Sequence, residues 1–393
     1  MKNLLLFFLL FFLLYKSYSQ IPLDTAGGRY RNLIFDSVLV KYDVLYSRSL
    51  NSLGQMQDLV LDVYEPYSDV LQARPFMVLV HGGSFLHGNK SDMASTCIHF
   101  AKKGYVAVSI QYRLGYTSFT AVGAFQTVIR ATQDLKNAIR FLRKSAAGSN
   151  PYRIQPEYAF AGGVSAGSMT ALHAAYMDQL SEILPGQTIP NLDSLHNAGQ
   201  IPGYEWKFKA VINIAGAIGD TNWIKAGDVP VTSFHGTADE VVPYESGSFG
   251  GAFALFGSRP IFLRAQHLGL ISELRPFPGA GHDYSSGNPS ATDTTLARIT
   301  RFLFPFLISP TTTKSQEIKT REIDLYKVPS GWKLVSINPI SEVQLFDLQG
   351  RILERKRVGE EIVLIAGTRQ GRILKMISEK GEVKSWVLVG GNW

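Results

Sequence analysis

The feature that most constrains the fold is an alternation of short apolar runs with longer amphipathic stretches between residues 76 and 307. Continuous apolar runs of this length are typical of strands in a sheet that is covered on both faces. Between and after them, residues 127–146 and 290–307 repeat apolar side chains every three or four positions, which predicts helices. The alternation therefore predicts an α/β fold with a mainly parallel sheet flanked by helices. The runs are FMVLV (76–80), YVAVSI (105–110), YAFAG (158–162), AVINIA (210–215), VPVTSF (229–234) and ELRPF (273–277).

The texture of the sequence changes on either side of this region. Upstream, residues 41–47 and 59–66 alternate in a way that predicts an antiparallel hairpin at the start of the sheet. Downstream, residues 309–322 are polar without apolar periodicity and read as a linker. Residues 323–393 contain short β-rich runs separated by glycines, which predict a small all-β sandwich. We thus expect an α/β domain over residues 20–308 and a second, all-β domain at the C-terminus.

The N-terminus has the composition of a secretory signal peptide. Lys2 precedes an apolar run from Leu4 to Tyr15, and small residues follow at Ser17 and Ser19. A run of about a dozen residues is shorter than the roughly 20 that span a bilayer as a helix. We therefore expect residues 1–19 to be removed before Gln20, the chain to be exported, and no stable transmembrane segment to remain.

The composition and the motifs argue against disulfide bonds, a nucleic-acid partner and a bound metal or cofactor. The single cysteine, Cys97, rules out an intramolecular disulfide, and we interpret it as a small buried apolar residue. The formal net charge is +7, but Lys and Arg are scattered, apart from a short cluster at residues 355–357. No basic run is interleaved with aromatic residues, so we expect no nucleic-acid partner. The chain has no metal-ligand spacing and no phosphate-binding loop, so we expect neither a metal nor a cofactor.

The stretch AGGVSAGS, residues 161–168, contains a G-x-S-x-G pattern centred on Ser165. The predicted strand 158–162 precedes it, and SMTALHAAYM, residues 168–177, can continue as a helix. A serine in a sharp strand-to-helix turn is exposed for nucleophilic attack, and the glycines beside it allow the close approach of neighbouring backbone. The context predicts that Ser165 is a nucleophile, with Gly163 and Gly167 as the residues that permit the turn.

Ester or amide chemistry at such a serine also needs donors for an oxyanion. LVHGGSFLHG, residues 79–88, follows the first predicted core strand. An H-G-G turn in this place leaves backbone N–H groups free to point inward. We expect the N–H groups of Gly83 and Ser84 to act together with that of Ala166.

A general base and its orienting acid are expected in loops after later strands. Asp239 follows the strand 229–234, and His282 follows the strand 273–277. Glu240 is adjacent to Asp239 but would face the other way, and Asp283 is expected to shape its loop. The remaining candidates are histidines that we interpret as structural, namely His81, His173, His235 and His267, and His87, which is a candidate for the pocket.

The substrate pocket is less well determined by sequence. Five residues near the predicted site are candidates for substrate contact, although each is equally consistent with packing: Phe85, Leu86, Tyr112, Trp223 and Tyr284. Residues 180–206 are rich in Gly, Pro and Asn and interrupt the α/β rhythm. A long loop of this kind is often functional, so we predict a lid or rim over the site.

With these residues in place, residues 38–307 resemble the α/β-hydrolase superfamily, and within it the esterase and lipase branch with an HGG-type oxyanion turn. Residues 323–389 resemble the type A C-terminal sorting domain of the type IX secretion system, through VQLFDLQGRIL (343–353) and GRILKMISEKGEVKSWVLV (371–389). The second resemblance implies that the type IX machinery is a partner, that the protein passes through the periplasm to the cell surface or medium, and that the tail takes no part in chemistry.

Together these observations predict a secreted serine esterase or lipase-type hydrolase that acts through an acyl-enzyme. Its substrates would be small-molecule or glycan-linked esters with short to medium acyl groups, or with acetyl or feruloyl groups on carbohydrate. Two alternatives stay open. One is a serine peptidase of the same fold, and the other is a catalytically inactive surface protein that binds glycans.

Overall fold

The computed structural model describes residues 23–179, 182–183, 201–249 and 253–308, together with seven strands between residues 323 and 388. The chain divides into two units, residues 1–310 and 311–393. The predicted signal peptide (1–19), the predicted linker (309–322) and most of the predicted lid (180–206) lie outside the described residues. The first unit contains the whole candidate site.

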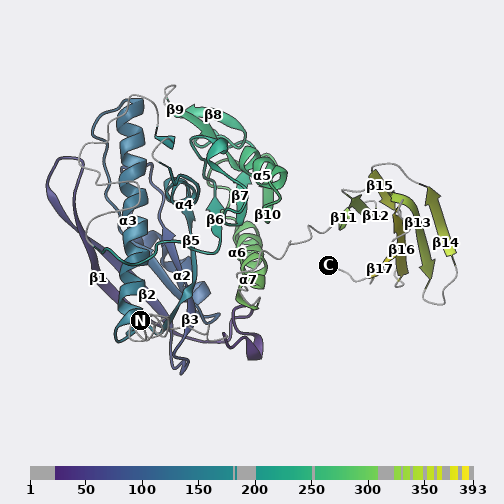
Figure 1. Cartoon of the computed structure of the whole chain (residues 1–393), viewed down its shortest axis with the longest axis horizontal. Coiled ribbons are helices and arrows are strands. Elements are labelled where there is room, and N and C mark those ends of the chain that lie inside the picture. The colour runs from purple at the N-terminus through teal and green to yellow at the C-terminus, as the bar shows by residue number, and fades with distance from the viewer. Residues whose placement is uncertain are drawn as a thin grey trace, which may run out of the picture. The chain divides into compact units, whose positions relative to one another are not determined.

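An eight-stranded sheet forms the centre of the first unit, in the order β1-β2-β4-β3-β5-β6-β7-β10. Figure 1 shows this sheet running from β1 on the left to β10 on the right. The pairs β1–β2 and β2–β4 are antiparallel, and all pairs from β4 to β10 are parallel. The strands are β1 (Val38–Leu50), β2 (Met56–Pro66), β3 (Arg74–Val80), β4 (Val106–Ile110), β5 (Ile154–Val164), β6 (Val211–Ile214), β7 (Val231–Gly236) and β10 (Ser272–Phe277). The predictions of a mainly parallel sheet and of an N-terminal hairpin are confirmed.

The sheet is apolar on both faces, which explains the unbroken apolar runs in the sequence. In β3, Phe76, Val78 and Val80 belong to one hydrophobic cluster. Met77 and Leu79 belong to the other. Since successive strand residues point to opposite faces, the strands β2 to β7 each supply both clusters at once. The edge strand β10 is only partly buried along its length, which corrects the expectation that residues 273–277 are covered on both faces.

Helices cover the two faces unequally. The first cluster is completed by α3 (Ala121–Ala147), α4 (Ala166–Tyr176) and α5 (Ser258–His267), and the second by α2 (Ala94–Ala101) and α6 (Pro289–Leu303). The helix predicted over 127–146 begins earlier, where the Thr120 side chain accepts a hydrogen bond from Gly123 N. The helix predicted over 290–307 is two helices, α6 and α7 (Pro305–Ile308). Pro305 lacks the N–H that would continue α6, so the break falls there.

Several shorter elements were not predicted. They are α2, α5, the antiparallel pair β8 (Ser246–Phe249) and β9 (Phe253–Phe256), and the 3-10 turns η2 (Ala26–Gly28), η3 (Lys90–Met93) and η5 (Thr221–Trp223). Cys97 is fully buried on α2, as the sequence predicts, and burial raises the pKa of its thiol well above the ordinary value. No helix among the described residues is long and apolar enough to cross a membrane.

The described strands of the second unit pair into two antiparallel sheets, β11-β12-β15 and β14-β13-β16-β17. That these sheets form a sandwich, and that they are a sorting domain, stays a prediction. The strands are β11 (Ile323–Val328), β12 (Gly331–Ser336), β13 (Ile340–Asp347), β14 (Ile352–Arg357), β15 (Glu361–Leu364), β16 (Arg372–Ser378) and β17 (Val383–Leu388).

Candidate active site

Ser165 lies at the junction of β5 and α4 in a backbone conformation that L-residues rarely adopt. Its φ and ψ are 55° and −121°. Such a conformation costs on the order of 1–3 kcal/mol and persists only where the surroundings impose it. The Ser165 N–H donates to the Ile214 carbonyl at 2.8 Å, and the Ser165 carbonyl accepts from Met169 N at 2.9 Å. These two bonds hold the turn at the sheet edge on one side and in the first turn of α4 on the other.

The two glycines beside the serine are required for steric reasons. A Cβ atom on either Gly163 or Gly167 would overlap the carbonyl oxygen of Val80 in β3. The absence of side chains at both positions lets α4 begin directly against the sheet, and this places Ser165 at the carboxyl ends of the parallel strands.

Three residues far apart in the sequence form a hydrogen-bonded chain at these strand ends. Ser165 Oγ lies 2.9 Å from His282 Nε2, and His282 Nδ1 lies 2.7 Å from Asp239 Oδ2. Asp239 follows β7 and its side chain is fully buried, whereas the His282 side chain, in the loop after β10, is 14% exposed. The carboxylate can only accept, so His282 carries its proton on Nδ1 and leaves Nε2 free to accept from the serine hydroxyl.

The Asp239 carboxylate is saturated with donors. Oδ1 accepts from the N–H groups of Val241 and Val242 at 2.9 and 2.8 Å, and Oδ2 accepts from His235 Nε2 at 3.0 Å in addition to His282. Burial by itself would raise the pKa of Asp239. The hydrogen bonds from His235, His282 and the Val242 N–H outweigh burial and hold that pKa well below the ordinary 3.8. Asp239 is therefore a stably ionised acceptor for His282.

The H-G-G turn after β3 lies against the serine. A Cβ on Gly82 would be 3.3 Å from Ser165 Cβ, so the two turns are in contact. Gly83, Ser84 and Phe85 have φ values of 107°, 52° and 60°, and the Gly83 carbonyl accepts from the N–H groups of Leu86 and His87. Within the described part of the chain, no acceptor engages the N–H groups of Gly83 and Ser84. Ala166 is the first residue of α4, so its N–H has no intrahelical acceptor either.

The ring of Tyr112 supports this turn from inside. Tyr112 stacks on His81 with ring centroids 4.4 Å apart, and its hydroxyl donates to the His81 carbonyl at 3.1 Å. Tyr112 has no exposed surface, so its expected role as a substrate contact is corrected to that of a support for the turn. Sequence places it after β4 but does not indicate which way the ring turns.

The other candidate pocket residues divide into packed and exposed side chains. Trp223 is 5% exposed and packs edge-to-face on His173, and Tyr284 is 6% exposed and stacks on Phe277 at 4.1 Å. Phe85 is 4% exposed, while Leu86 is 38% exposed. Of the predicted contacts, Leu86 alone offers a substantial apolar surface.

A pair of stacked rings beside the H-G-G turn was missed in the sequence. The Tyr116 hydroxyl donates to the Ser84 carbonyl at 2.9 Å, and its ring stacks on Phe119 with centroids 5.6 Å apart. The Phe119 side chain is 88% exposed. Gly115 N also donates to the Phe85 carbonyl at 2.8 Å, so this aromatic pair is tied to the turn at two points. No motif marks these residues, because the contact depends on how loop 111–119 crosses the turn.

That loop is anchored by a buried ion pair. The Arg113 side chain contacts Asp134 on α3 at 2.8 Å, and the Arg113 backbone N–H donates to the same carboxylate at 2.8 Å. Burial raises the pKa of Asp134 despite the opposing effect of Arg113. The guanidinium also donates to the Leu50 and Arg130 carbonyls, which links the loop to β1 and α3.

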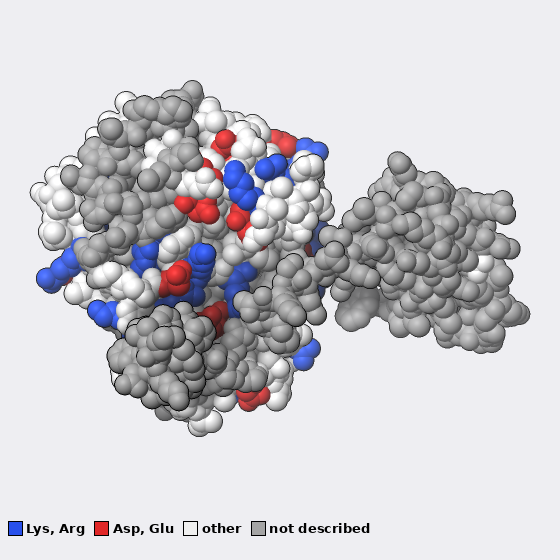
Figure 2. All heavy atoms as spheres, in the orientation of Figure 1, with Lys and Arg blue, Asp and Glu red and all other residues white. Residues whose placement is uncertain are grey.

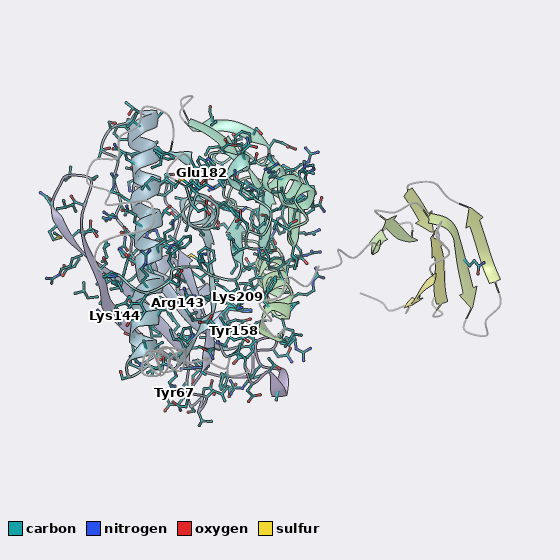
Figure 3. The ribbon with its side chains drawn as sticks, viewed as in Figure 1. Tyr67, Arg143, Lys144, Tyr158, Glu182 and Lys209 are labelled. Carbon is teal, nitrogen blue, oxygen red and sulfur yellow. The ribbon has the colours of Figure 1, made fainter. Side chains whose placement is uncertain are left out.

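A cavity of about 520 Å³ lies elsewhere, between β1, the end of α3 and Ile201. Its lining includes Tyr46, Phe141 and Lys144 but none of the residues at the serine. Figure 3 labels Lys144 beside Arg143.

On the face drawn in Figure 2, Lys and Arg side chains lie beside Asp and Glu side chains. Among the described residues no group of three or more His, Cys, Asp or Glu could hold a metal ion.

The chain has the α/β-hydrolase fold, and solved structures of this fold align with it over 70% of its length. Esterase 2 of Thermogutta terrifontis phosphoramylated by tabun is 24% identical, with a TM-score of 0.53, and covers 70% of this chain and 97% of its own. The apo form of that enzyme is also 24% identical, with the same coverage and a TM-score of 0.52. The propionate-bound form, with the same identity and coverage, has a TM-score of 0.51.

A family model covers part of the chain. The model of the BD-FAE family matches residues 61–219, which include the H-G-G turn and Ser165 and end before Asp239 and His282. No curated protein matches the sequence.

Proposed function

We propose that this protein is a serine carboxylic-ester hydrolase that acts through an acyl-enzyme. The observation that carries the proposal is the hydrogen-bonded chain from Ser165 Oγ through His282 to Asp239. Beside it lies the H-G-G turn, in which the N–H groups of Gly83 and Ser84 meet no acceptor among the described residues. A nucleophile, a base with an orienting acid, and preorganised donors are the elements that acyl transfer requires.

Each group has a defined role in the proposed reaction. His282 Nε2 takes the Ser165 proton while the serine oxygen bonds to the ester carbonyl carbon. The N–H groups of Gly83, Ser84 and Ala166 receive the oxyanion. As the tetrahedral intermediate collapses, the imidazolium protonates the leaving alcohol and the acyl group stays on Ser165. His282 then deprotonates a water that attacks the acyl-enzyme, and its proton returns to the serine when the carboxylic acid leaves.

We propose short-to-medium acyl esters, including acetyl or feruloyl esters of carbohydrates, as the substrate class. The structures of Thermogutta terrifontis esterase 2 include propionate-bound and butyrate-bound forms, which supports the short acyl range. The exposed surfaces of Leu86 and Phe119 beside the oxyanion turn support an apolar or ring-bearing substrate.

The proposal extends to location. An apolar N-terminus with small residues before Gln20 supports export, and the sequence from 323 to 389 supports passage through the type IX machinery. Mass spectrometry of the protein from its native host tests this. We expect a mature N-terminus at Gln20 and a C-terminus upstream of residue 323. An intact Met1 together with an intact Trp393 would contradict export by this route.

The decisive experiment is a panel of nitrophenyl esters of increasing acyl length, with feruloyl and acetylated-sugar esters and a peptide substrate. The control is Ser165→Ala, and labelling by a fluorophosphonate reports the nucleophile directly. We expect ester turnover and a Ser165 adduct that the variant lacks. Peptide but not ester turnover would favour the peptidase, and absence of the adduct in folded protein would favour the inactive binding protein.

A further inference from the structure

A second imidazole contacts the carboxylate that orients the proposed base. His235 is the penultimate residue of β7, four positions before Asp239, and is fully buried. Its Nε2 lies 3.0 Å from Asp239 Oδ2 and 3.0 Å from the Val242 carbonyl. Asp239 Oδ2 is therefore shared between two histidines, one of which reaches the serine.

The surroundings of His235 determine where its proton lies. The Val242 carbonyl can only accept, so Nε2 carries the hydrogen and donates to that carbonyl and to Asp239 Oδ2. On the other side of the ring, Nδ1 lies 2.7 Å from Ser258 Oγ, the hydroxyl of the first residue of α5. A hydroxyl can donate to an unprotonated nitrogen, so the neutral imidazole satisfies every contact.

The hydroxyl is itself held by a buried amide. Asn213 Nδ2 donates to Ser258 Oγ and to Ser233 Oγ, each at 3.0 Å, and Asn213 Oδ1 accepts from Gly216 N at 3.0 Å. Ser258 Oγ thus accepts a hydrogen bond from Asn213 Nδ2 and donates one to His235 Nδ1. This chain reaches from β6 through α5 to β7 without an unsatisfied member.

We propose that His235 is a positioning residue, which acts through Asp239 to fix the orientation and charge of the carboxylate that holds His282. The proposal rests on the proposed function, because the readout is Ser165-dependent ester hydrolysis. With His235 in place, each oxygen of the Asp239 carboxylate accepts two hydrogen bonds. Rotation of the carboxylate away from His282 would then also break the bond from His235. Without it, Oδ2 retains only the bond from His282.

The His235 ring also packs edge-to-face on Tyr244 at 5.7 Å. The positioning of Asp239 by His235 must therefore be distinguished from a role of His235 in packing alone. A mutant cycle makes the separation. We would compare His235→Leu in the parent and in Asp239→Asn, since interaction through Asp239 makes the two losses non-additive. Tyr244→Leu is the matched control, because it removes the packing partner and leaves the hydrogen bonds of His235 intact.

We expect His235→Leu to lower kcat about 10- to 100-fold in the parent with little change in KM, as loss of a donor to a charged group predicts. In Asp239→Asn the same substitution should lower kcat less than about threefold. His235→Gln, which keeps an N–H near the position of Nε2, should recover most of the parent kcat. Equal losses in both backgrounds, or a Gln variant no better than Leu, would show that His235 is only structural.

A second measurement separates this inference from the proposed function. The low-field proton resonance of His282 Nδ1–H reports the His282–Asp239 contact without any substrate, and its loss in a His282→Gln variant distinguishes it from His235 Nε2–H, which donates to the same carboxylate. We expect it in the parent and in His235→Gln, and broadened or shifted in His235→Leu. A parent without ester turnover but with this pattern contradicts the proposed function and supports the positioning role. An unchanged resonance in folded His235→Leu overturns the positioning role whatever the activity.

Discussion

Gly167 lies directly against the carbonyl oxygen of Val80, so that the start of α4 and the end of β3 meet without any intervening side chain. The contact joins the serine turn to the strand that leads into the H-G-G turn. It therefore sets how closely the two turns of the candidate site approach one another.

Gly167→Ala tests this contact. The added methyl group would overlap backbone at Val80, so β3 and α4 must separate, and we expect a loss of about 2–4 kcal/mol in the free energy of unfolding. Ester turnover should fall at least tenfold. Gly148→Ala is the control, because its Cβ would sit 3.6 Å from the nearest atom. Urea unfolding of both variants is the measurement, and equal stabilities would contradict the steric argument.

Ser165→Gly tests the strain at the nucleophile. Glycine tolerates a φ of 55°, so relief of strain should exceed the added entropy of the unfolded chain. We expect a gain of about 1 kcal/mol over Ser165→Ala in the free energy of unfolding, with both variants inactive. Thermal unfolding of the pair measures this gain. A Gly variant less stable than the Ala variant would show that the strain costs less than the added entropy of the unfolded chain.

The depressed pKa of Asp239 predicts a pH dependence of stability. The folded state binds the Asp239 proton more weakly than the unfolded state does, so its contribution is full above about pH 4 and is lost as the pH falls further. Asp239→Asn should be less stable than the parent at pH 7, and this difference should shrink between pH 4 and pH 2. Parallel denaturation curves across that range measure it. A difference independent of pH would contradict the assignment of the charge.

Phe119→Ala tests the aromatic pair of Tyr116 and Phe119 beside the H-G-G turn. If the exposed ring receives part of the substrate, its removal should raise KM for feruloyl or sugar-linked esters about three- to tenfold and leave short alkyl esters, which carry no ring, unchanged. Stability should change little, since the side chain is 88% exposed. Leu53→Ala, at another exposed apolar residue, is the control. A uniform rise of KM on all esters would argue against a ring-specific contact.

The sequence predicts the sheet well because burial on both faces leaves a strong local signal. The shorter helices were missed for local reasons too. Helix α5 carries Pro260 in its first turn, where a missing N–H is harmless but where the residue reads as a helix breaker in a sequence. Helix α2 is only eight residues long, too short for a clear stripe.

In the candidate site too, residues that a local motif marks could be predicted, whereas contacts between segments distant in sequence could not. The need for Gly163 and Gly167 follows from the geometry of a strand-to-helix turn and is visible in the motif. The contact between His235 and Asp239 depends on how the loop after β7 folds back, and the support from Ser258 comes from a helix that was not predicted. Tyr116 likewise reaches Ser84 only because of the path of its loop. Such contacts arise from tertiary structure and leave no spacing to recognise.

Finally, the single thiol gives this protein a built-in reporter. Cys97 is inaccessible on the buried face of α2, and its raised pKa keeps it in the unreactive protonated form. A thiol reagent therefore reads out only molecules in which α2 has opened from the sheet. Its rate of reaction measures how often that layer opens, in every variant described above, without a label or a substrate.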